Sequence, residues 1–254
     1  MAYTGTLALI SGAGSGMGQL AAKNLAATGA TVIALDLDHK GLQDTAAGSD
    51  SVHTYVVDVT NIQAVNAIVE QVLADHGVPD RVMTAAGIMP TGKIVDMETP
   101  LIHKVMAVNY GGTVNVVKAL LPAMLAEERG EIVTFGSMAG VIPTLLFGAY
   151  NASKFAVVSF TEVLAHEHRG SGVKFSCICP PLVATPLLDR EKDRVKQLKN
   201  RQPLQPQQVL DAIERGVERG QLMIFPDSVS KLGWRMRRFV PDLVWRTVHS
   251  EEGF

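Results

Sequence analysis

The chain of 254 residues is long enough to bury the core of one large α/β domain. Its hydrophobic fraction of 47% and charged fraction of 19% are typical of a globular protein and exclude a disordered chain. A formal net charge of -2 gives no overall attraction to nucleic acid or to an anionic membrane surface, so neither is expected as a partner.

The N-terminus does not resemble a secretory signal, because it has no basic segment and glycines interrupt its apolar stretch from Gly12 onward. A cytoplasmic location is therefore the default expectation. Cys177 and Cys179 stand two apart in an apolar run, where they should be buried residues on one face of a strand. Neither a disulfide nor a metal site is expected from them.

Apolar, β-branched runs alternate with helix-like stretches along most of the chain. Strands are predicted at residues 6–11, 31–36, 51–58, 81–85, 131–136, 173–179 and 222–225. Helices are predicted at residues 16–28, 61–76, 100–126, 149–169 and 207–219. This alternation predicts an α/β fold, a Rossmann-type doubly wound parallel sheet in a single domain over residues 1–254. Ligands of such sheets bind beyond the carboxyl ends of the strands.

Two segments near the C-terminus depart from this pattern. Residues 182–206 include a highly charged run, and they are predicted to form a mobile substrate loop. Residues 226–254 form a C-terminal extension in which aromatic, aliphatic and basic side chains are mixed. The extension has three interpretations, which are a substrate lid, a subunit interface and an amphipathic helix on a membrane surface. Pro241 divides it, which weighs against the membrane surface.

The first predicted strand runs directly into a glycine-rich turn with the spacing G-x-x-x-G-x-G. Glycines permit a sharp turn without Cβ atoms, and the N-terminus of the helix that follows attracts anions such as a pyrophosphate. The candidate cofactor-binding residues of the turn are Gly12, Ser15, Gly16, Met17 and Gly18. The alternative is a tight turn that needs glycine for its geometry alone.

Two carboxylates follow the second and third predicted strands. Asp36 can accept hydrogen bonds from the ribose hydroxyls of an adenosine and would repel a 2′-phosphate, so NAD is predicted over NADP. Lys40 is the residue that could reverse this preference. Asp58, next to Val59, is a candidate acceptor for the adenine amino group. Its alternative role is to cap the helix that begins near Asn61.

Tyr150 and Lys154 lie four residues apart in a predicted helix and therefore share one of its faces. A tyrosine has an ordinary pKa of about 10, and a neighbouring ammonium is expected to lower it so that the phenol can exchange a proton. The pair alone could also be an ordinary solvated face. Ser137 strengthens the catalytic interpretation, because it follows a strand at the edge where ligands bind and its hydroxyl could hold a carbonyl oxygen.

Together these residues resemble the short-chain dehydrogenase/reductase family over roughly residues 6–225. The resemblance rests on the order and spacing of the glycine turn, Asp36, Asp58, Ala86-Gly87, Asn109, Ser137, Tyr150 and Lys154. It implies a catalytic tetrad in which Asn109 holds the water of a proton relay through Lys154, although Asn109 could instead be a helix-breaking polar residue. It further implies a homodimer or homotetramer. The cofactor contacts that it adds are Ala86, Gly87, Tyr150, Lys154, Pro180, Val183 and Thr185.

Four positions depart from the family pattern without removing a reacting group. Thr84-Ala85 stands where the family has two asparagines, so the amides that brace the central strand are missing. Pro181 replaces a glycine, which stiffens the turn over the nicotinamide, and Ser11 replaces a threonine.

The side chains expected around the substrate are nearly all apolar, and no arginine or lysine lies among them, although several could be ordinary core residues. They are Met89, Met138, Val141, Leu145, Leu146, Phe147, Leu182, Val183, Leu187 and Leu188, with Ser137, Tyr150 and Pro181 at the reacting end. The prediction is an NAD-dependent enzyme that interconverts an apolar secondary alcohol, of steroid, terpenoid or aromatic type, and its ketone. The alternatives are an NADPH-dependent ketone or 3-ketoacyl reductase and a non-catalytic NAD-binding protein.

Overall fold

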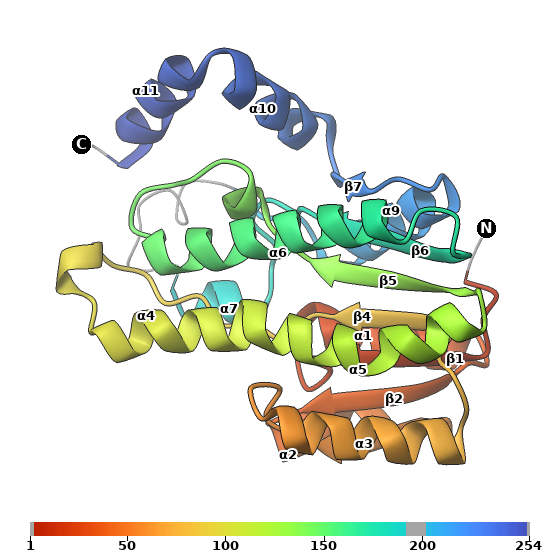
Figure 1. The fold of residues 1–254 in the computed structure, drawn as a ribbon. Helices are drawn as coiled ribbons and strands as arrows, with labels where there is room; N and C mark the ends of the chain where they lie inside the picture. Colours follow the sequence, from red (N-terminus) through yellow and green to blue (C-terminus); the bar gives the residue numbers. More distant parts are fainter. Residues whose placement is uncertain (1–2, 192–201, 253–254) are drawn as a thin grey trace.

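Seven parallel strands form one sheet in the computed structural model, which describes residues 3–191 and 202–252 (Figure 1). Their spatial order is β3-β2-β1-β4-β5-β6-β7. The chain thus winds outward in both directions from β1 and β4, which confirms the predicted doubly wound sheet and its single domain. The strands are β1 Leu7–Ser11, β2 Thr31–Asp36, β3 Val52–Val56, β4 Arg81–Thr84, β5 Gly130–Phe135, β6 Val173–Ile178 and β7 Met223–Ile224.

Helices cover both faces of the sheet, because its central strands are apolar on both sides. α3, α5 and α6 lie on one face, and α1 and α9 lie on the other (Figure 1). Alternate residues of β1 show the division, since Leu9 packs under the first group and Ile10 under the second. The helices are α1 Gly16–Ala27, α2 His39–Ala46, α3 Ile62–Asp75, α4 Thr99–Met106, α5 Gly112–Ala126, α6 Gly148–Glu167, α7 Pro186–Asp189, α9 Pro206–Glu218, α10 Ser228–Phe239 and α11 Pro241–Glu252.

The long helix predicted over residues 100–126 is divided in the structure. α4 and α5 are joined by a π-helical turn, Ala107–Gly111, and Asn109 lies within it. The backbone stays helical through this turn, so Asn109 does not break the helix as its alternative interpretation expects. A π-helical turn also widens the helix locally, so it can direct one side chain inward. The side chain of Asn109 is fully buried.

The described residues after β6 include a short helix and a bridge near the ends of the predicted substrate loop. α7 begins at Pro186, and the backbones of Val183 and Leu204 form an isolated bridge that ties together the two ends of the predicted substrate loop. Residues 192–201, which hold most of its charged run, lie outside the described residues. The C-terminal extension consists of α10 and α11, with Pro241 as the first residue of α11. Proline suits that position because the first N–H of a helix has no partner within the helix.

Candidate active site

The glycine turn between β1 and α1 forms a cradle that only glycine can line at two positions. Gly12 has a φ of 76°, and a Cβ there would stand 2.4 Å from the amide nitrogen of Ala86. A Cβ on Gly18 would stand 2.1 Å from the carbonyl oxygen of Gly12. Ser15 precedes α1 without capping it through its side chain. The first N–H groups of α1, at Gly16 to Gly18, have no partner within the helix, so the cradle fits the pyrophosphate of a dinucleotide.

Asp36 faces this cradle from the end of β2. Its Oδ2 accepts a hydrogen bond from the N–H of Gly14 at 2.8 Å, and its Oδ1 accepts one from the N–H of Asp38 at 2.9 Å. The carboxylate is half-buried and held in one orientation, as the sequence interpretation requires. Lys40 is exposed on α2, which was not predicted from the sequence. The carboxylate therefore sets the charge at this edge of the cradle.

Asp58 is exposed, and its Oδ1 accepts hydrogen bonds from the backbone and the hydroxyl of Thr60. The cap of α3 is Asn61, whose side chain accepts from the N–H of Ala64. Asp58 thus shapes the turn before the helix, which is close to its alternative role. Val59 is buried, and its carbonyl accepts a hydrogen bond from Asn115 at 2.8 Å.

Tyr150, Lys154 and Ser137 meet at the carboxyl edge of β5. Tyr150 and Lys154 lie in the first turns of α6, and both are buried. The Lys154 ammonium donates to the carbonyl oxygen of Phe135 at 2.7 Å and lies 5.7 Å from the ring centroid of Tyr150. The Oγ of Ser137 accepts from the N–H of Ala139 at 3.0 Å. Its own hydroxyl proton is therefore left to bond an oxygen beside Tyr150.

Burial dominates the protonation of this pair. It raises the pKa of Tyr150 to about 12, although a hydrogen bond with Ser137 acts in the opposite direction. Burial also lowers the pKa of Lys154 to about 8, although Cys177 and Cys179 act against this change. The sequence interpretation expects a lowered tyrosine pKa, and the protein groups alone produce the reverse, because burial disfavours the phenolate more than the hydrogen bond with Ser137 stabilises it.

Asn109 holds the loop that follows β4 against α6. Its Oδ1 accepts from the N–H of Ile88 at 2.8 Å, and its Nδ2 donates to the carbonyl of Ile88 at 3.0 Å. Nδ2 also donates to the Oγ of Ser153 at 2.9 Å. A Cβ on Gly87 would stand 3.2 Å from Oδ1 of Asn109 and 3.8 Å from Nζ of Lys154. The structure therefore brings Asn109 and Gly87 close to Lys154.

The turn after β6 reaches the glycine cradle through Thr185. A Cβ on Gly16 would stand 3.5 Å from the Cβ of Thr185, which is buried. The carbonyl of Pro180 accepts from the N–H of Met138 at 2.9 Å and so joins this turn to the residues after Ser137. Val183 does not reach the cleft with its side chain, since it packs in the core beneath α1 and α9.

Part of the predicted substrate wall gathers around Tyr150. This apolar cluster contains Met89, Leu146, Phe147, Leu182, Leu187 and Leu188. Met138 and Val141 belong to another cluster, in which they pack with Cys177 and Cys179. Both cysteines are free and buried, as predicted. Leu145 and Pro181 are half-buried outside the cluster around Tyr150.

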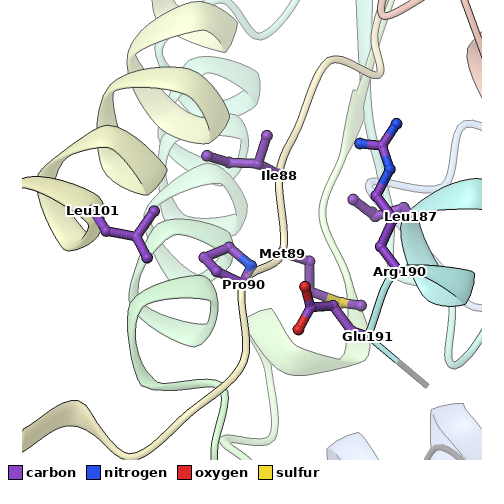
Figure 2. Close-up of a pocket in the computed structure, with 7 residues that line it drawn as sticks. All are labelled: Ile88, Met89, Pro90, Leu101, Leu187, Arg190 and Glu191. Atoms are coloured by element: carbon purple, nitrogen blue, oxygen red, sulfur yellow. The ribbon is translucent and has the colours of Figure 1, made fainter. Parts of the chain in front are cut away.

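A cavity of about 200 Å³ opens beside this cluster, between the loop after β4 and α7 (Figure 2). Its lining residues are Ile88, Met89, Pro90, Leu101, Leu187, Arg190 and Glu191. A hydrogen bond joins Glu191 to the loop after β4, because its Oε2 accepts from the hydroxyl of Thr91 at 2.5 Å. Two charged side chains, Arg190 and Glu191, thus line a cavity beside the apolar cluster, although the sequence places them in a charged run with no sign of this position.

Thr84 marks the departure from the family pattern at the end of β4. Its hydroxyl is buried without a hydrogen-bond partner among the described residues. In the family an asparagine stands here, with a longer amide side chain. Threonine does not supply that amide, and its own hydroxyl stays unsatisfied.

Comparisons with known proteins agree with this geometry. The sequence model of the short chain dehydrogenase family matches residues 6–196. Human estradiol 17-beta-dehydrogenase 11 is 32% identical over 247 residues, covering 94% of this chain and 80% of that protein. Rat 17-beta-hydroxysteroid dehydrogenase 13 is 32% identical over 254 residues, covering 96% and 82%. A short chain dehydrogenase/reductase from Burkholderia phymatum, solved in complex with NAD, superposes with a TM-score of 0.83 at 29% identity, covering 94% of this chain and 95% of that one.

Proposed function

Because the chain belongs to the short-chain dehydrogenase family of oxidoreductases, we propose that it uses NAD to interconvert an apolar secondary alcohol and its ketone. One observation carries this proposal. Tyr150 is buried with its hydroxyl at Ser137, its ring near the Lys154 ammonium, and apolar side chains around it. A buried phenol between a hydroxyl donor and an ammonium is suited to pass a proton to or from an oxygen.

Each residue of the site has a separate role in this proposal. In the oxidative direction Tyr150, as phenolate, takes the proton from the substrate hydroxyl, and Ser137 donates a hydrogen bond to the same oxygen. Lys154 stabilises the phenolate, and Asn109 fixes the loop at Ile88 that borders the lysine. The chemistry that a nicotinamide would supply here, when bound, is the acceptance of the hydride from the carbinol carbon. The apolar cluster excludes water from the reacting atoms.

The preference for NAD rests on Asp36. Its carboxylate is oriented toward the cradle by the N–H groups of Gly14 and Asp38. A carboxylate in this position can accept hydrogen bonds from the ribose hydroxyls and would repel a 2′-phosphate. The glycine turn itself carries no basic side chain that could compensate. The contacts predicted for Ala86, Gly87 and Thr185 are part of the same proposal.

The substrate class follows from the apolar cluster and from the names of the relatives. Two of them are dehydrogenases of 17-beta-hydroxysteroids, whose reacting group is a secondary alcohol on a large apolar ring system. A steroid alcohol or ketone is accordingly the first substrate to test for this chain. Terpenoid and aromatic alcohols of similar polarity come next.

The test is a panel of hydrophobic secondary alcohols incubated with NAD or with NADP, with reduced cofactor measured by absorbance. We expect turnover of at least one bulky alcohol and a higher kcat/KM with NAD. A strong preference for NADP would contradict the argument from Asp36 and favour the ketone or ketoacyl reductase alternative. Binding of NADH without turnover of any alcohol or ketone would favour a non-catalytic protein.

A further inference from the structure

The C-terminal helix α10 is attached to the body of the protein by one side. A Cβ on its Gly233 would stand 3.1 Å from Cδ1 of Ile142, so the helix lies directly against the loop that follows β5. The guanidinium of Arg237 donates to the carbonyl of Val141 at 3.3 Å and lies 5.3 Å above the ring of Phe155 in α6. These contacts fix which side of α10 faces inward and which side faces outward.

The outward side of α10 combines basic and large apolar side chains. Leu232 is 60% exposed and Phe239 is 78% exposed. Lys231, Arg235 and Arg238 are exposed beside them. The five residues are spaced three or four apart along two adjoining rows, so they share one face of the helix. α10 contains four basic residues and no acidic one, in a chain whose net charge is -2.

The segment that follows α10 adds exposed apolar side chains and one arginine, although the sequence of α11 also holds three acidic residues, Asp242, Glu251 and Glu252. Val240 is 38% exposed, Leu243 is 51% exposed, and Arg246 is exposed one turn later. Asp242 is the acidic residue in the first turn of this helix. Figure 1 shows α10 and α11 as an outer layer beyond β7, at some distance from the sheet. Large apolar side chains thus lie exposed next to concentrated positive charge.

We propose that this outer face of α10 and α11 binds an anionic lipid surface. The face consists of Lys231, Leu232, Arg235, Arg238, Phe239, Val240, Leu243 and Arg246. Its composition fits the interface of a bilayer, where apolar side chains enter the headgroup region and basic ones pair with lipid phosphates. In the described part of the chain no helix is long and apolar enough to cross a membrane, so α10 and α11 would lie along the surface.

Two arguments from the sequence against a membrane surface lose their force in the structure. The net charge of -2 is not shared evenly, since α10 alone carries four positive charges. Pro241 does not break a helix, because it is the first residue of α11, whose exposed residues include Leu243 and Arg246. If the proposed function also holds, binding would keep the loop after β5, next to Ser137, close to the lipid in which apolar alcohols dissolve.

Cosedimentation of the full chain with lipid vesicles tests the proposal independently of catalysis. Wild-type protein should bind vesicles that contain phosphatidylglycerol and should not bind vesicles of phosphatidylcholine alone. The variant Arg235→Glu/Arg238→Glu should bind at least on the order of 30-fold more weakly, since each lost cation is expected to weaken binding about fivefold. Leu232→Ser/Phe239→Ser should also bind more weakly. The control Lys118→Glu/Arg169→Glu changes two exposed charges elsewhere, one on α5 and one in the turn after α6, and should bind like the wild type.

Thermal unfolding of each variant excludes loss of the fold as the reason for weak binding. Equal binding of the wild type and the α10 charge variant would overturn the proposal, as would no binding of the wild type to either vesicle. A wild-type dimer that both α10 variants convert to monomers in the absence of lipid, with no vesicle binding, would assign the face to a second copy of this chain instead. Failure of the proposed enzymatic function would leave the vesicle result unchanged.

Discussion

Replacing Lys154 by methionine should remove activity while leaving the protein as stable as before or more so. Burial lowers the pKa of Lys154 from 10.5 to about 8, which means that the charged form is disfavoured in the folded state by about 3 kcal/mol at neutral pH. Methionine has a similar shape and no charge, so it avoids this cost. The variant also loses the hydrogen bond to the carbonyl of Phe135, which offsets about 1–3 kcal/mol of the stability gained by removing the charge. The expected change therefore lies between zero and about 2 kcal/mol of added stability.

The pH dependence of stability separates this effect from ordinary repacking. A group whose pKa is lower in the folded than in the unfolded state makes stability rise with pH between the two values. Wild-type protein should therefore gain about 1 kcal/mol between pH 8 and 9, and Lys154→Met should not. Urea denaturation followed by circular dichroism measures both. A loss of more than about 2 kcal/mol in the variant, or the same pH dependence in both proteins, would refute the reasoning.

Three further substitutions test the cofactor site and its supports. Asp36→Asn should lower the ratio of kcat/KM for NAD to that for NADP at least about tenfold, a change of about 1.4 kcal/mol, while the exposed control Asp38→Asn leaves it unchanged. Asn109→Ala should cost about 2–4 kcal/mol in urea denaturation, because it strips the N–H and the carbonyl of Ile88 of their partners; a cost below about 1 kcal/mol would contradict that role. Gly18→Ala should weaken NADH binding, measured by fluorescence, and destabilise the fold by about 1–3 kcal/mol, because its Cβ would collide with the backbone of Gly12.

The sequence predicts the sheet well because its signals there are local. Strands that are apolar on both sides and the glycine turn can be recognised from the spacing and position of residues such as Leu9, Ile10 and Gly12 alone. α2 was missed because it is short, with eight residues of which Leu42 is the one large apolar side chain that is buried. The sequence pattern of residues 100–126 is that of one α-helix and does not reveal the π-helical turn at Asn109, nor the bonds of Asn109 to Ile88 and Ser153, which are distant in sequence.

Prediction of the site from the sequence is limited in the same way, because it too depends on contacts between distant residues. Which residues meet at Tyr150 follows from the strand order, but their protonation depends on how deeply they are buried, and the sequence gives no measure of depth. The pKa of Tyr150 is therefore raised where a neighbouring ammonium alone would lower it. Arg190 and Glu191 belong to a charged run, and only the packing of α7 shows that they line a cavity. The exposed face of α10 likewise depends on the contacts of Arg237.

The central claim is that Tyr150 moves the proton, and Tyr150→Phe tests it most directly. Phenylalanine keeps the ring among its apolar neighbours and removes the hydroxyl that lies at Ser137. On whichever alcohol the wild type oxidises, kcat should fall by about 10²–10⁴-fold or more, whereas the Kd for NADH, measured by fluorescence, should change less than about twofold. A variant that binds NADH and retains wild-type turnover would contradict the account.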